Sequence, residues 1–96
     1  MEYDWDENKR SENIHNHGID FIGCEAVFEG YKITVEDDRF PYYERRFITL
    51  GLMEGRVVVV AHTETEDVIR IISIRKAKRH EQKTYFQNSP FPRLTN

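Results

Sequence analysis

Apolar and polar residues alternate along the middle of the chain in a way that predicts a β-sheet. Residues 31–36 alternate strictly, which is the period-two pattern of a half-buried strand. Three further strands are predicted at 44–53, 56–63 and 68–75, and short turns such as Glu54-Gly55 separate them. The third of these four strands contains a run of valines that is apolar on both faces, so we expect it to be central. Successive short turns favour an antiparallel meander.

Two helices are predicted before the sheet. Asp6 is a suitable N-cap for a polar helix over residues 7–16, and Gly18 is a suitable C-terminal stop. Asp20 is expected to cap a second helix that ends at Gly30. Its apolar residues recur at spacings of three and four and form one stripe. They are Phe21, Cys24, Val27 and Phe28.

The two ends of the chain complete the predicted domain. Residues 2–5 form either a short first strand or a lid in which Tyr3 and Trp5 pack on the core. Residues 76–87 read as a last helix, and 88–96, which contains two prolines, reads as a loose tail. We therefore predict an α+β single domain over residues 1–87, with two N-terminal helices, about four antiparallel strands and a C-terminal helix.

Composition adds the expected cellular setting and charge distribution. A single cysteine and the lack of a long apolar run predict a cytoplasmic protein that does not use a membrane. The net charge is −3, but residues 1–50 carry −6 and residues 51–96 carry +3. Five Lys/Arg residues fall between Arg75 and Lys83, which suits phosphate binding. The same split charge could equally serve only to keep a small protein soluble.

Several short motifs, ordered over residues 3–86, resemble those of the BrnT toxin family. The N-terminal motifs are Tyr3-Asp4-Trp5-Asp6, Lys9, Asn13, His17-Gly18-Ile19-Asp20-Phe21 and Ala26-Val27-Phe28. The later motifs are Arg46-Phe47, Gly51, Arg70-Ile71-Ile72-Ser73, Arg75-Lys76-Ala77, Glu81 and Tyr85. Three positions depart from the family's usual residues: Asn16 replaces a lysine, Tyr43 a glycine and Ile74 an alanine. The first removes a cation that could help bind RNA.

The resemblance implies a compact RelE-like fold and a function. It implies a type II toxin that is a ribonuclease and inhibits translation. Its partner would be BrnA, a ribbon-helix-helix antitoxin, and operator DNA would be bound only through the toxin–antitoxin complex. The alternative is a non-catalytic protein-interaction module, or a decayed toxin, that only binds a partner.

RNA cleavage without a metal or other cofactor needs positive charge on the phosphorane, and Arg70 and Arg75 are candidates for it. Arg75 is our first choice for phosphate contact, against a solvated strand end. Five residues separate the two arginines, so they should point to opposite faces of their strand. They should therefore not bind the same phosphate unless the strand bulges or ends. Arg70 should share a face with Ile72 and Ile74, and could instead form a salt bridge to Glu44 or Glu64.

Proton transfer also needs candidates. His62 and Glu64 share one face of a strand and could act as an acid/base pair, although a histidine at a strand end is often structural. Tyr85 could donate a proton or stack on a base, and it could equally be part of the core. Glu81 could be a base or only a partner for neighbouring side chains.

The remaining candidates would bind RNA. One stripe of the last helix carries Lys76, Arg79 and Lys83 at spacings of three and four, and it is either an RNA contact or a solvated face. Arg46 is either a substrate cation or half of an ion pair with Glu44. We expect no metal, because His15 and His17 lack the spacing of a helical metal site.

Overall fold

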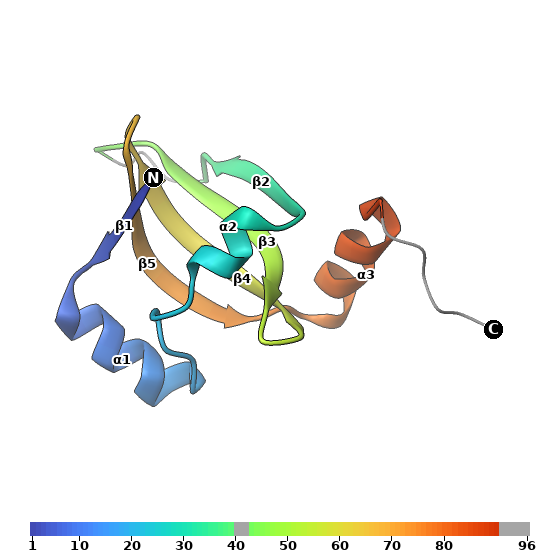
Figure 1. Cartoon of the computed structure of the whole chain (residues 1–96), viewed down its shortest axis with the longest axis horizontal. Coiled ribbons are helices and arrows are strands. Elements are labelled where there is room, and N and C mark those ends of the chain that lie inside the picture. Colours follow the sequence, from blue (N-terminus) through green and yellow to red (C-terminus); the bar gives the residue numbers. More distant parts are fainter. Residues whose placement is uncertain (40–42, 91–96) are drawn as a thin grey trace.

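The computed structural model describes residues 1–39 and 43–90 as a curved five-stranded sheet with three helices around it (Figure 1). The elements in chain order are β1 (Glu2–Trp5), α1 (Glu7–His17), α2 (Glu25–Glu29), β2 (Lys32–Asp37), β3 (Arg46–Met53), β4 (Arg56–Glu64), β5 (Val68–Lys76) and α3 (Arg79–Asn88). The predicted α+β class is confirmed. Residues 40–42, between the predicted strands 31–36 and 44–53, and residues 91–96 of the predicted tail lie outside the described parts.

The strand order is β1-β5-β4-β3-β2, and all neighbours are antiparallel except β1 and β5. The meander of four strands is confirmed, and β4 is central as its valines predicted. The N-terminal stretch is a fifth strand rather than only a lid. It pairs with β5 in parallel, with Tyr3 opposite Ile69.

The helices begin and end at capping residues, with two changes from the prediction. Asp6 accepts hydrogen bonds from the first turn of α1, and Gly18 ends that helix at φ 69°. The second helix starts at Glu25 rather than after Asp20, because Gly23 has φ 97°, which no helix accommodates. The last helix starts later than predicted, because β5 continues to Lys76.

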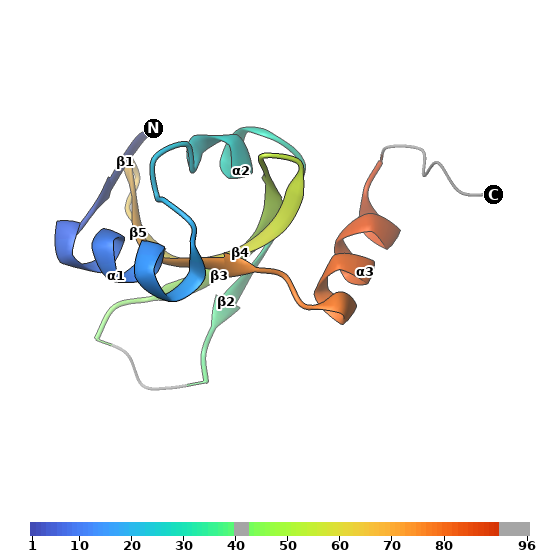
Figure 2. The same ribbon diagram turned by 90° about the horizontal axis from the view of Figure 1, so that it is seen from below.

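The sheet has two faces, which we name after the helices that pack on them. The α2 face carries the side chains of Val58, Val60 and His62, and the α3 face carries those of Val57, Val59 and Thr63. Figure 2 shows α2 on one side of the sheet and α3 beyond its end. A Cβ atom on Gly51 would lie 2.6 Å from Cγ1 of Val27, so only glycine allows α2 to approach β3 this closely.

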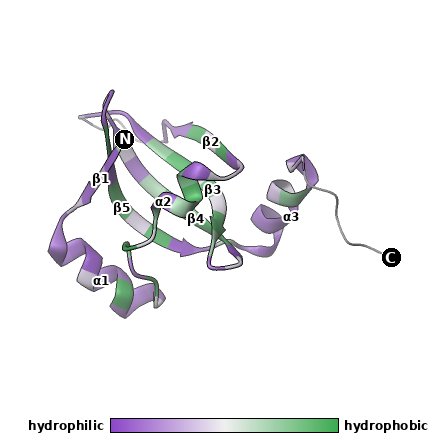
Figure 3. Ribbon diagram, in the orientation of Figure 1, coloured by the Kyte–Doolittle hydropathy of each residue, from purple (hydrophilic) through white to green (hydrophobic). Residues whose placement is uncertain are grey.

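Most of the apolar core lies on the α2 face. Cys24 is fully buried there, as its place on the apolar stripe predicted. A smaller cluster on the α3 face joins Val57 and Val59 to Ala77 and Tyr85. Figure 3 shows the apolar residues concentrated on the sheet and α2, while α1 and α3 are mostly hydrophilic. Within residues 1–39 and 43–90, none of the helices has the length and apolar character needed to cross a membrane.

A β-bulge divides β5 into two halves. Ile71 pairs with His62, but Ser73, and not Ile72, pairs with the preceding residue of β4, Ala61. The extra residue is therefore Ile72. Because one added residue reverses the alternation of side chains, every residue after it points to the opposite face from the one that simple counting predicts.

Asn13 of α1 holds the second half of β5. Its side-chain oxygen accepts a hydrogen bond from the Ile74 amide at 3.0 Å, and its Nδ2 donates to the Ile74 carbonyl at 2.9 Å. The same nitrogen donates to the Ile19 carbonyl at 2.8 Å. The pairing of β1 with β5 ends at Ile71, so Asn13 takes the place of a strand partner just beyond that point.

Replacing Asn13 with alanine should lower the free energy of unfolding by roughly 3 kcal/mol, because three buried backbone groups would lose their partner. Urea denaturation at neutral pH measures this change. Asn16→Ala is the matched control, since this exposed neighbour on α1 should change stability by less than about 0.5 kcal/mol. Equal small effects of both substitutions would contradict the role assigned to Asn13.

Candidate functional site

Arg70 and Arg75 lie on the same face of the sheet. Arg70 pairs with Thr63 and Arg75 with Val59, and both of these β4 residues belong to the α3 face. The prediction of opposite faces is therefore wrong, because the bulge at Ile72 reverses the alternation of side chains before Arg75. Arg70 likewise does not share a face with Ile74, which is in the core of the α2 face. Four residues of β4 separate the two positions, or roughly 13 Å along the strand.

Arg46 lies on the same face as these two arginines. It pairs with Asp37 on β2, and the next residue of β3, Phe47, pairs with His62 on the α2 face. Arg46 and Arg70 therefore flank Thr63 from the two neighbouring strands, with their Cα atoms roughly 10 Å apart. The structure thus brings together three of the arginines that the sequence suggested, on strands β3 and β5.

Arg70 forms an ion pair with Asp4 of β1, in which its Nη1 lies 3.2 Å from Oδ1. Both side chains are about half exposed, at 49% and 53%. The predicted partners, Glu44 and Glu64, are wrong because the parallel pairing of β1 with β5 places Asp4 directly opposite Arg70. Sequence reasoning missed Asp4, and the only available signal was the alternative that residues 2–5 form a strand. An exposed pair of this kind contributes little stability, so a ligand can displace it.

Arg75 is held by Glu81 through two hydrogen bonds, of 2.8 and 2.9 Å, from the guanidinium to both carboxylate oxygens. Glu81 also accepts a hydrogen bond from the Lys78 amide at the start of α3. The hydrogen bonds from Arg75 are the main cause that lowers the pKa of Glu81 to about 2. The same hydrogen bonds raise the pKa of Arg75. Glu81 is therefore a poor proton acceptor, and the pair fastens α3 to the end of β5.

The other predicted residues of the last helix divide between core and surface. Tyr85 is 2% exposed, and its hydroxyl donates to the Tyr31 carbonyl at 2.8 Å. Burial is the main cause that raises the pKa of this phenol. Arg79 and Lys83 of α3 are exposed. The predicted helical stripe is wrong for Lys76, because this exposed residue is the last of β5 and pairs with Val58. The helix therefore offers cations to solvent and an aromatic residue to the smaller core.

His62 and Glu64 lie on the opposite face from the arginines. Both line a cavity of about 500 Å³ on the α2 face, together with Phe28 and Lys32. His62 is 1% exposed, and its Nε2 shares a hydrogen bond of 2.7 Å with Thr49 rather than with Glu64. Its other ring nitrogen is buried without a hydrogen-bond partner. Burial lowers the pKa of His62 to about 4, so the ring is neutral at pH 7.

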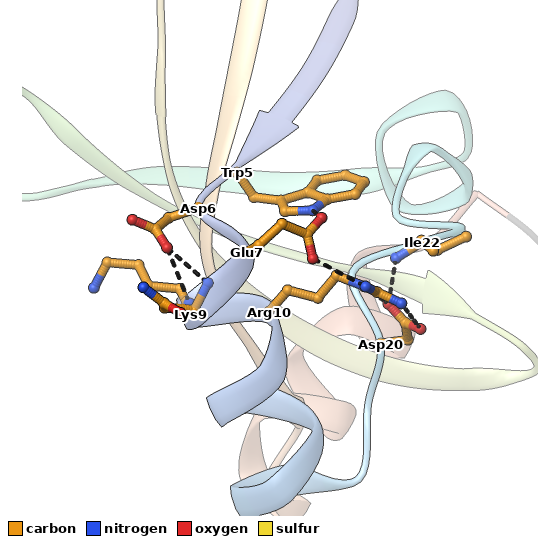
Figure 4. Close-up of polar contacts among 8 residues, drawn as sticks. Trp5, Asp6, Glu7, Lys9, Arg10, Asp20 and Ile22 are labelled. Carbon is orange, nitrogen blue, oxygen red and sulfur yellow. Dashed lines mark hydrogen bonds and ion pairs between the residues drawn. The ribbon is translucent and has the colours of Figure 1, made fainter.

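A polar network at the start of α1 fixes the direction of β1 and therefore the place of Asp4. Arg10 donates two hydrogen bonds to Asp20, of 2.7 and 3.0 Å, and one to Glu7 at 3.0 Å (Figure 4). The indole of Trp5 also donates to Glu7, at 3.1 Å. The hydrogen bonds that Asp20 accepts, those from Arg10 foremost, lower the pKa of Asp20 to about 2. The network ties the end of β1 to the turn before α2.

No group of three or more His, Cys, Asp or Glu side chains in residues 1–39 and 43–90 is arranged to share a metal ion. The residues gathered on the α3 face are instead arginines with single carboxylates beside them. Such an arrangement can bind phosphate oxygens, stabilise negative charge and accept a proton.

The buried neutral His62 predicts a pH dependence of stability. Its pKa is about 4 in the folded chain and 6.5 when exposed, so the unfolded chain takes up a proton first as the pH falls. Stability should therefore decrease by roughly 3 kcal/mol between pH 7 and pH 4. The carboxylates Asp20 and Glu81 act mainly below this range. In urea denaturation, His62→Gln should remove most of the decrease, and an unchanged slope in this variant would contradict the prediction.

Comparison with known proteins adds a family to this geometry. Residues 5–81 match the family described as the ribonuclease toxin BrnT of type II toxin-antitoxin systems. A search among curated proteins finds no match. The matched span runs from the end of β1 through all the sheet arginines to Glu81 in α3. The chain therefore belongs to the BrnT family, whose members are ribonuclease toxins of type II toxin-antitoxin systems.

Proposed function

We propose that this toxin binds RNA on the α3 face and cleaves it without a metal ion, through the neighbouring 2′-hydroxyl. The observation that carries the proposal is that Arg46 and Arg70 flank Thr63 on one face, with the Asp4 carboxylate beside Arg70. Arginine binds two phosphate oxygens at once and stays charged, so it suits a phosphate whose negative charge increases during reaction.

The proposed reaction has one nucleophile and one leaving group. A carboxylate accepts the proton of the 2′-hydroxyl, and the freed oxygen attacks phosphorus. The bond from phosphorus to the 5′-oxygen breaks, and the 5′-oxygen takes up a proton from solvent water. Asp4 is the candidate proton acceptor, because it is exposed and lies 3.2 Å from Arg70. Arg70 and Arg46 would stabilise the phosphorane. An RNA phosphate can replace Asp4 as the partner of Arg70 at little cost, since that ion pair is solvated.

Arg75 has a second role in this proposal. Its guanidinium is bound on two sides by Glu81, so it holds α3 in place rather than offering a free fork to RNA. The exposed cations Arg79 and Lys83 would then extend the positive surface beyond the sheet, whereas Lys76 pairs with Val58 and so belongs to the α2 face. RNA would run from the arginines of the sheet toward α3.

The remaining residues predicted as catalytic serve the fold in this proposal. His62 is neutral and buried on the α2 face, and Glu64 borders the same cavity, so neither reaches the arginines through the sheet. Tyr85 is buried and its hydroxyl is bonded to the backbone of Tyr31. We therefore assign no proton transfer to these three side chains.

The partner follows from the family. A type II toxin works with an antitoxin protein, and we propose that the antitoxin here is a ribbon-helix-helix protein of the BrnA type. Operator DNA would be bound by the complex through that antitoxin. The cytoplasm is the proposed place of action, because its RNA substrate and a DNA-bound antitoxin are found there.

Induced expression of the chain should arrest growth, and co-expression of a ribbon-helix-helix protein encoded beside it should relieve the arrest. Growth curves and translation rates, measured by incorporation of a labelled amino acid, test both statements. Soluble folded protein must be verified in each culture. Normal growth with folded protein would instead favour a binding module without catalysis.

Arg70→Ala should reduce RNA cleavage by roughly a hundredfold or more, because one group that stabilises the phosphorane is removed. Arg45→Ala is the matched control. Arg45 is also an exposed arginine in an ion pair, with Glu36, but its side chain packs over Phe47 on the α2 face. Cleavage by this variant should stay within a few-fold of the wild type.

Cleavage of a labelled RNA by the purified proteins measures both rates. A substrate with a single 2′-deoxy nucleotide at the cut site tests the nucleophile and should remain intact. Equal loss of activity in Arg45→Ala and Arg70→Ala would contradict the proposed site. Cleavage of the 2′-deoxy substrate would contradict the proposed mechanism.

A further inference from the structure

An apolar strip lies on the α3 face beside the arginines. It consists of Ile33 and Val35 of β2 and Ile48 and Leu50 of β3, which we name the β2–β3 strip. Ile33 pairs with Leu50 and Val35 pairs with Ile48, so the four side chains form two adjacent rows on one face. Apolar side chains that meet in rows on a sheet face normally pack under another element.

Only part of the strip is covered by α3. Ile33, Ile48 and Leu50 pack at the border of the small cluster that contains Tyr85 of α3. Val35, in the row farther from that cluster, is 57% exposed. A valine so exposed in a strand is an apolar contact point that the described fold leaves to solvent.

The strip continues directly into the row of arginines. The pair Asp37–Arg46 is the next register position after Glu36–Phe47, and the row after Val35–Ile48 on this face is therefore that of Arg46. Arg46 in turn lies beside Thr63 and Arg70. A segment bound along the strip would thus reach Arg46 directly, on the same strand, and Arg70 across one intervening strand, β4.

We propose that the β2–β3 strip is the docking surface for an acidic amphipathic segment of the antitoxin, which neutralises the toxin by covering Arg46 and Arg70. This inference rests on the proposed function, since it takes the RNA site to be on the same face. The charges support this occupant. Arg46 continues the strip, opposite Asp37, and Arg70 and Arg75 lie on the same face beyond β4, each paired with one carboxylate. The helix α3 adds exposed Arg79 and Lys83.

A protein segment suits the strip better than RNA does. Its four side chains are aliphatic and offer neither an aromatic ring for a base to stack on nor a hydrogen-bonding group. Aliphatic rows bordered by cations are complementary to a segment with Leu or Val on one side and Asp or Glu on the other. Acidic groups would also compete with phosphate for the arginines, so binding of antitoxin and RNA would exclude each other.

The test uses Val35→Glu, which places a like charge among the proposed acidic contacts of the partner. Because Val35 is largely exposed, the variant should fold and keep its RNA cleavage within a few-fold of the wild type. Its dissociation constant for the antitoxin should increase at least tenfold, or about 1.4 kcal/mol. Cells that co-express this variant with the antitoxin should remain arrested.

Ile22→Glu is the matched control. This variant also replaces an aliphatic side chain with glutamate, at a position that is 58% exposed and so closely matches Val35. Ile22 lies in the turn before α2, away from the strip. This variant should bind antitoxin as the wild type does, and co-expression should restore growth. Isothermal titration with the full-length antitoxin, at two salt concentrations, gives both dissociation constants and the electrostatic contribution.

Three results would overturn the inference. Equal antitoxin affinity of Val35→Glu and wild type removes the strip from the interface. Selective weakening by Ile22→Glu places the partner on the other side of the molecule. Loss of cleavage by Val35→Glu with unchanged antitoxin affinity assigns the strip to RNA. A wild-type chain that binds no antitoxin refutes the proposed partner as well. If Val35→Glu loses antitoxin binding but Arg70→Ala cleaves RNA as fast as the wild type, only the proposed RNA site is refuted.

Discussion

The second half of β5 depends on one buried side chain, Asn13. A strand that runs beyond its parallel neighbour leaves backbone groups without partners, and these groups are costly to bury. Asn13 satisfies both backbone groups of Ile74 and also holds the chain that follows α1 at Ile19. It thereby connects α1, the turn before α2 and the central sheet, and it keeps β5 in register directly after the bulge.

The bulge decides which charges meet. Without it, regular alternation would place Arg70 on the face opposite Arg75. With Ile72 as the extra residue, both arginines and Arg46 are on the α3 face, while His62 and Glu64 stay on the α2 face. Cations and potential proton-transfer groups are therefore separated by the sheet. For this reason the proposed function assigns proton transfer to the solvated carboxylate beside Arg70 and not to the buried His62.

Polar and aromatic contacts hold the junction of β5 and α3 together. Arg75 and Glu81 form a two-pronged ion pair that fastens the helix, and Tyr85 and Tyr31 add a hydrogen bond and an aromatic contact at the same junction. The helix has a small apolar footprint, so these polar contacts are important for its position. The same junction limits how much of the sheet α3 covers, and Val35 at the end of the strip stays 57% exposed.

The sequence by itself determined the local features of this protein. Asp6, Gly18 and Gly30 mark helix ends through backbone chemistry within a few residues, and the alternation in β2 and the valine run of β4 identify their strands. The family could also be recognised from ordered motifs. Tertiary structure alone decided the parallel pairing of β1, the bulge at Ile72 and the partners of Arg70 and Arg75. Those features depend on contacts between residues far apart in the chain, or on a register shift that no local pattern encodes, and each one changes which side chains share a face.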